Sequence, residues 1–116
     1  MDDAAFLKAL QKGTLPKEEM DHRAHLRLAM LCRGEPERAR AILLGYVTRV
    51  GSGVRFNETL TRFWLRLVAQ HPDQDLDGLV ELLSDTNLPL QHYSPERLWS
   101  DEAQRSFVEP DLRPLP

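Results

Sequence analysis

The chain has little cysteine, little net charge and no long apolar run. Cys32 is the only cysteine among 116 residues, so no disulfide can form within the chain, and a reducing cytoplasm is the expected location. The net charge is −3 with acids and bases interspersed, and no basic patch of the kind that binds nucleic acid stands out. No run of about 18 apolar residues indicates a membrane span, and no signal peptide is recognisable. We therefore expect neither a nucleic-acid partner nor a membrane partner.

Strand signals are scarce too, since the chain shows no sustained alternation of apolar and polar residues and no Asn-Gly or Asp-Gly hairpin turn. Apolar residues recur instead at helical spacing, as at Met20, Ala24, Leu28 and Leu31. Apolar residues make up 41% and charged residues 28% of the chain, which is typical of a folded domain. The sequence thus predicts one all-α domain, a bundle of four to five helices joined by short loops.

Capping residues and helix breakers set the expected helix bounds. Five helices are predicted: from Asp2 or Asp3 to Gly13, from Leu15-Pro16 to Arg33-Gly34, from Pro36 to the break at Gly51-Ser52-Gly53, from about Asn57 to His71, and from about Leu76 to Leu83. Two short turns capped by serine follow at residues 94–97 and 100–103. Three prolines among the last seven residues exclude a helix there. We expect a helical domain over residues 1–107 and an extended tail over residues 108–116.

One polar cluster, Asp21-His22-Arg23-Ala24-His25, lies near the start of an apolar helical run. On a helix, Asp21, His25 and His22 fall at about 0°, 40° and 100°, so they share one side. Two imidazoles at this spacing can hold one metal ion, and imidazole and carboxylate suit zinc or non-haem iron. The His-x-x-His spacing is weak evidence alone. The cluster also fits a polar ligand pocket, or a carboxylate at a helix start bonded to one histidine.

A second polar cluster, Phe56-Asn57-Glu58-Thr59, opens the helix predicted from Asn57. Short loops make successive helices antiparallel, so the second and fourth helices should run in the same direction, with both clusters at one end. Glu58 is then the best third ligand for a metal held by His22 and His25. The same residues are explained without a site if Asn57 is an N-cap and Glu58 stabilises the helix dipole or pairs with an arginine one turn later.

Four motifs in this order resemble a family of small, all-helical bacterial proteins over residues 15–112. The motifs are Asp21-His22-x-x-His25-Leu26-Arg27-Leu28-Ala29, Asn57-Glu58-Thr59-Leu60-Thr61, Tyr93-Ser94-Pro95-Glu96-x-Leu98 and Phe107-Val108-x-Pro110-Asp111. Members of that family carry Tyr-His-Glu-Thr at residues 56–59, which implies a constellation of three histidines and a glutamate. The resemblance implies no particular activity.

This chain departs from the family pattern at Asn57, and asparagine is a poor ligand for zinc or iron. The residues that remain, His22, His25 and Glu58, are compatible with a site of two histidines and one carboxylate. Alternatively, the site has degenerated or was never metallic, and Asn57 acts in it as a hydrogen-bonding group.

Two functional hypotheses follow from these patterns. The first is a cytoplasmic protein with a polar pocket between helices, formed by His22, His25, Asn57 and Glu58, that binds a divalent metal (zinc or iron) or a small polar ligand. If the pocket is catalytic, Glu58 is the candidate general base and a histidine the metal ligand or acid. The second is a non-catalytic helical module for protein–protein interaction, whose partner surface is the tail and the turns around Trp99.

Overall fold

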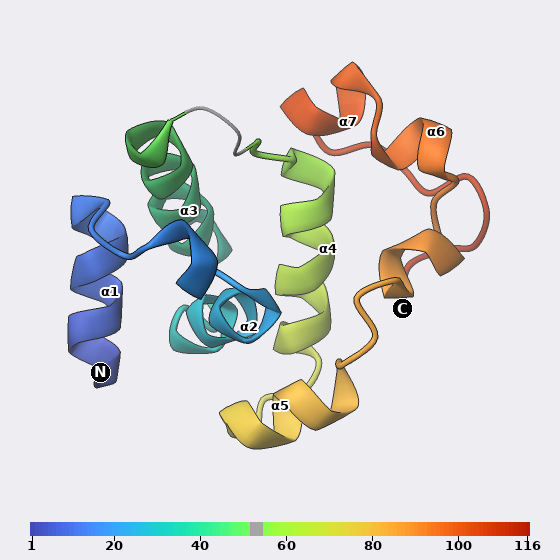
Figure 1. The fold of residues 1–116 in the computed structure, drawn as a ribbon. Helices are drawn as coiled ribbons and strands as arrows, with labels where there is room; N and C mark the ends of the chain where they lie inside the picture. Colours follow the sequence, from blue (N-terminus) through green and yellow to red (C-terminus); the bar gives the residue numbers. More distant parts are fainter. Residues whose placement is uncertain (52–54) are drawn as a thin grey trace.

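The computed structural model describes residues 1–51 and 55–116, and over these residues it is all-helical, with no strand (Figure 1). Seven α-helices lie in the described part of the chain, and five of them have at least seven residues. They are α1 (Asp3–Lys12), α2 (His22–Leu31), α3 (Pro36–Val50), α4 (Glu58–Ala69), α5 (Leu76–Leu82), α6 (Pro95–Leu98) and α7 (Asp101–Arg105), with 3-10 turns η1 (Lys17–Glu19) and η2 (Leu88–Gln91). None of the described helices combines the length and the apolar character needed to cross a membrane.

Side-chain caps define where most helices begin. The same cap, a side-chain oxygen that accepts from the backbone N–H three residues later, opens four of the longer helices, at Asp2, Asp21, Asn57 and Asp75. Pro36 opens α3, and Gly13 closes α1 with a φ of +71°, a conformation that favours glycine. Gly51 ends α3 as predicted, whereas Ser52 and Gly53 lie outside the described residues. The predicted helices are therefore confirmed to within about two residues, except for the second.

The second predicted helix is wrong in its first third. The turn η1 comes first, and α2 begins only at His22. Asp21 has extended backbone, with φ −89° and ψ −173°, and its carboxylate accepts from the N–H of Ala24 at 2.9 Å. Asp21 is therefore the N-cap that precedes the helix rather than a residue on the helical face of His22 and His25.

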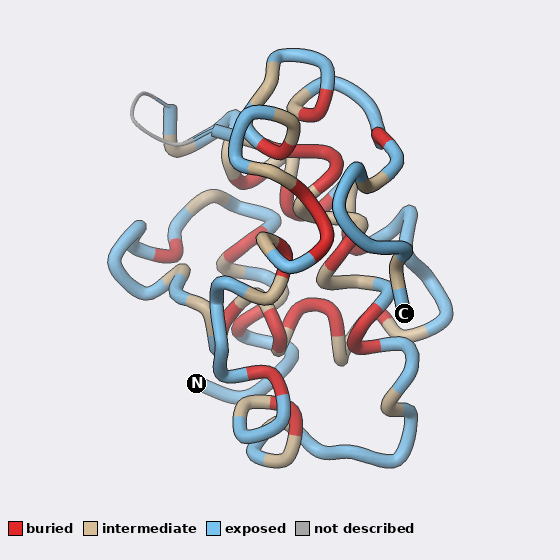
Figure 2. Tube along the Cα trace, turned by 90° about the vertical axis from the view of Figure 1, so that its right-hand side faces the viewer, coloured by how far each residue is buried: buried red, intermediate tan, exposed pale blue. Residues whose placement is uncertain are grey.

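The apolar core is divided into two clusters that meet at α2. The first cluster joins α1, α2 and α3 and includes Phe6, Leu28 and Tyr46. The second joins α4, α5 and the C-terminal segments, with Leu26 of α2, and includes Phe63. Figure 2 shows the buried stretches in red running through the middle of the molecule, with exposed turns outside them. One side chain of α4, Leu65, packs against both clusters. A boundary between two clusters is a place where a cavity can persist.

Helix α2 runs across α4 rather than along it (Figure 1). The His22 ring lies 4.8 Å from the ring of Trp64, halfway along α4. Glu58 comes six residues earlier on α4, about 9 Å along the helix axis at 1.5 Å per residue. The expectation that the second and fourth helices run in the same direction, with both polar clusters at one end, therefore does not hold.

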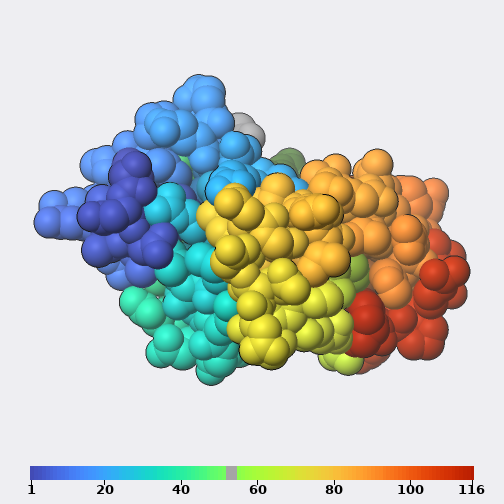
Figure 3. Space-filling model, turned by 90° about the horizontal axis from the view of Figure 1, so that it is seen from below, coloured from blue at the N-terminus to red at the C-terminus, as the bar shows by residue number. Residues whose placement is uncertain are grey.

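The last residues, 108–116, are extended and bonded to the rest of the chain. Asp111 accepts hydrogen bonds from the N–H and the hydroxyl of Ser94, and the N–H of Leu112 donates to the carbonyl of His92. Val108 is 96% buried and belongs to the second apolar cluster. Figure 3 shows this segment lying against the surface of the C-terminal half. The tail is thus packed on its own chain.

Candidate ligand cavity

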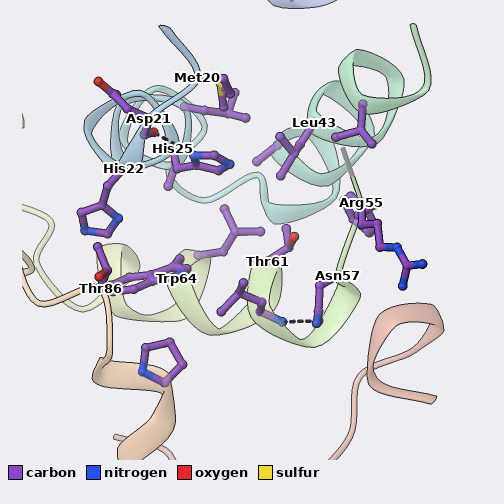
Figure 4. A pocket seen from close by; sticks show the side chains of 18 of the residues that line it. Met20, Asp21, His22, His25, Leu43, Arg55, Asn57, Thr61, Trp64 and Thr86 are labelled. Carbon is purple, nitrogen blue, oxygen red and sulfur yellow. Dashed lines mark hydrogen bonds between the residues drawn. The ribbon is translucent and has the colours of Figure 1, made fainter. Parts of the chain in front are cut away.

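A cavity of about 490 Å³ opens between α2, α3 and α4 (Figure 4). It lies where the two apolar clusters meet, and its walls are mostly apolar. They are formed by Met20, Leu28, Ala29, Ala39, Leu43, Tyr46, Val47, Phe56, Leu60, Trp64, Leu65, Pro89, Leu90, Leu98 and Trp99. The remaining lining residues are Lys17, Asp21, His22, His25, Arg55, Asn57, Thr61, Thr86 and Asn87. A volume in this range and walls of this kind are typical of sites for small organic molecules.

His25 presents a hydrogen-bond acceptor to this cavity. Its Nδ1 lies 2.8 Å from the backbone carbonyl of Asp21, and because a carbonyl only accepts, Nδ1 carries the proton. Burial lowers the pKa of His25 from its usual 6.5, although the hydrogen bond to Asp21 acts in the opposite direction. The ring is therefore neutral at neutral pH. The other nitrogen, Nε2, then has a free lone pair, and no hydrogen bond joins it to any described residue. Figure 4 shows the ring pointing into the cavity.

His22 is engaged elsewhere. Its Nε2 lies 2.7 Å from the carbonyl of Leu83, at the end of α5, so by the same argument Nε2 is the protonated nitrogen. Its ring packs edge-on against Trp64. His22 therefore lines the cavity and also joins α2 to α4 and α5.

Asn57 lines the cavity but uses its amide group for structure. Its Oδ1 accepts from the N–H of Leu60 at 2.9 Å, and its Nδ2 donates to the carbonyl of Leu98, also at 2.9 Å. The first bond caps α4, and the second ties that helix start to the end of α6. The interpretation of Asn57 as an N-cap is confirmed.

Glu58, the candidate third ligand and general base, does not join the histidines. It is 5% exposed, and its two carboxylate oxygens accept from Arg40 at 2.6 Å and from Arg62 at 2.9 Å. It is not among the residues that line the cavity. Within the described ranges, no three His, Cys, Asp or Glu side chains gather as a group that could hold a metal ion. The structure thus brings His22, His25 and Asn57 to one cavity and places Glu58 in an ion-pair cluster beside α3.

Thr61 is a cavity residue that sequence reasoning missed. Figure 4 shows its side chain directed at the cavity, and its hydroxyl makes no hydrogen bond to a described residue. The signal was present, because Thr61 comes four residues after Asn57 and three before Trp64, the spacing of one helix face. The Thr61 hydroxyl and His25 Nε2 are therefore polar groups of the cavity wall without a hydrogen bond to a described residue, and the side chains of Thr86 and Asn87 are in the same position.

The partial burial of His25 makes the stability of the protein depend on pH. Its pKa is lower in the folded protein than in the unfolded chain, so the unfolded state binds more protons below about pH 6.5. This contribution to stability is fully present above that pH and is lost as the pH falls through the folded pKa. We expect urea unfolding to give a smaller free energy of unfolding at pH 5 than at pH 7.5. The difference should shrink in His25→Phe, and an unchanged difference in that variant would contradict the assignment.

Comparisons of the chain with models of protein families, with curated proteins and with solved structures find no match. The resemblance to a bacterial family on the four motifs therefore stays a prediction. The function has to be argued from the cavity.

Proposed function

We propose that the protein binds a small organic molecule, with an apolar body and a polar group, in the cavity between α2, α3 and α4. The observation that carries this proposal is the combination of apolar walls with a few polar groups that have no partner among the described residues, His25 Nε2 and the Thr61 hydroxyl among them. Apolar walls favour an apolar body because each square ångström removed from water contributes about 25 cal/mol. The few polar groups then orient the ligand.

The donor set favours an organic ligand over a divalent metal. Zinc sites use three or four protein ligands, and no such group exists among the residues that the structure describes. The carboxylate that sequence reasoning offered as the third ligand, Glu58, is bonded by two arginines. The alternative function as an interaction module has less support, because the tail packs on its own chain through Val108 and Asp111.

The test uses benzofuran, a rigid apolar probe that fits the cavity, in an NMR titration of the isotope-labelled protein. We expect saturable binding at one site with a Kd of about 0.1 to 1 mM, the range that nine non-hydrogen atoms can supply. The side-chain N–H signal of Trp64 should shift, because that ring forms part of the wall. Absence of saturable binding by benzofuran and by its analogue indole, or shifts confined to residues outside the cavity, would refute the proposal.

A further inference from the structure

The hydrogen-bond capacity of the cavity restricts the kind of ligand that fits it. His25 is held by the bond from Nδ1 to the backbone carbonyl of Asp21, which fixes both the orientation of the ring and its tautomer. The nitrogen that faces the cavity is therefore an acceptor with no hydrogen to give. A ligand atom placed against it has to be a donor, since an acceptor there would set two lone pairs against each other.

We infer that the ligand carries a neutral hydrogen-bond donor, an O–H or N–H on a compact aromatic or branched apolar body, and that it donates this hydrogen to Nε2 of His25. This inference rests on the proposed function and names the ligand class. Phenols, alcohols and indole-type amines belong to that class. The Thr61 hydroxyl, which both donates and accepts, can serve a second polar atom of the ligand.

Three charged groups also line the cavity. Asp21, next to His25, has one carboxylate oxygen occupied as the cap of α2. Two cationic side chains, Lys17 and Arg55, also line the cavity. Figure 4 shows the Arg55 guanidinium extending away from the interior of the cavity, so its positive charge does not lie beside His25. A neutral donor therefore suits the position beside His25 better than a carboxylate, which would meet the lone pair of Nε2.

The partial burial of His25 also supports a ligand that donates a hydrogen bond to Nε2. The pKa of His25 is lowered chiefly by desolvation; the hydrogen bond to the Asp21 carbonyl opposes this effect, the neighbouring His22 adds to it, and the charge of Asp21 opposes it. The ring therefore keeps its acceptor at neutral pH instead of becoming an imidazolium, which would have two donors and no acceptor.

The experiment compares indole with benzofuran, two probes of nearly equal shape of which only indole has an N–H. We expect the wild-type protein at pH 7.5 to bind indole about tenfold more tightly, the factor that one satisfied hydrogen bond supplies. In His25→Phe the ratio of the two affinities should fall to about one. The matched control is Thr61→Val, which removes another polar group without a described partner and should retain most of the indole preference.

The outcomes separate the two proposals. If neither probe binds, the proposed function fails and the ligand class fails with it. If both probes bind equally well to the wild type, or if the preference for indole persists in His25→Phe, the cavity still binds ligands but the inference about the donor is overturned. A loss of preference in Thr61→Val alone would equally overturn it, because Thr61 would then be the acceptor.

A second measurement covers the case in which His25→Phe does not fold. In the wild-type protein, the nitrogen-15 chemical shift of His25 Nε2 reports directly on a hydrogen bond to that atom. We expect saturating indole to move this shift and benzofuran to leave it nearly unchanged. Equal shifts with both probes, or no shift with bound indole, would overturn the inference.

Discussion

Replacing Glu58 with alanine should lower the free energy of unfolding by about 2–3 kcal/mol. The Glu58 side chain is 5% exposed and forms ion pairs with two arginines that come from different helices, Arg40 from α3 and Arg62 from α4. Removing one partner of a fully buried pair costs about 3–5 kcal/mol, because it leaves an unpaired charge. The expected loss is smaller here since the arginine side chains are 31% and 28% exposed and can be rehydrated. Urea unfolding of the wild type and the variant at pH 7.5 measures this loss of free energy of unfolding.

Glu37→Ala is the matched control for that variant. Glu37 accepts from the same Arg62, at 2.7 Å, but its side chain is 75% exposed. Exposed ion pairs contribute little, so we expect a much smaller loss of stability than in Glu58→Ala. At a temperature where both variants are folded, both should bind benzofuran as the wild type does, because neither glutamate lines the cavity. If Glu58→Ala keeps its stability but loses probe binding, Glu58 belongs to the site after all.

The helices could be predicted because their signals are local. The carboxylate of Asp2 and the left-handed conformation of Gly13 bound α1 through atoms only a few residues apart in the chain. The prediction that the second helix begins at Leu15-Pro16 is wrong for a reason that is also local. Pro16 and the acids that follow are good helix-start signals, but Asp21 is also an N-cap, and two competing starts cannot both open one helix. The later start is the one that the folded chain uses.

The location of the site was partly predictable and its composition was not. Asn57, Thr61 and Trp64 recur at intervals of four and three residues and share the face of α4 that lines the cavity. Glu58 follows Asn57 by one residue, a rotation of about 100°, so the two side chains point in different directions. Which of these faces turns toward α2 depends on how α2 crosses α4. The apolar walls from α3 and from Pro89 come from distant parts of the chain, and local patterns do not indicate them.

Filling the cavity from α4 should abolish probe binding without unfolding the protein. In Thr61→Trp, a large ring would replace a small side chain that points into the open space (Figure 4). A ligand would then have to displace packed atoms, which costs about 2 kcal/mol, so we expect benzofuran affinity to fall at least about thirtyfold. The melting temperature should stay unchanged or rise, because the new side chain gains contacts across a void.

Thr48→Trp is the control for this variant. Thr48 lies on the exposed side of α3, where its hydroxyl bonds to the carbonyl of Leu44, so the same substitution adds a tryptophan outside the cavity. We expect it to bind benzofuran with wild-type affinity in the same titration. If Thr61→Trp folds and still binds benzofuran as the wild type does, the probe occupies another place. If Thr48→Trp loses binding as well, the effect comes from the added aromatic ring and not from the cavity. A loss confined to Thr61→Trp would place the ligand between α2, α3 and α4.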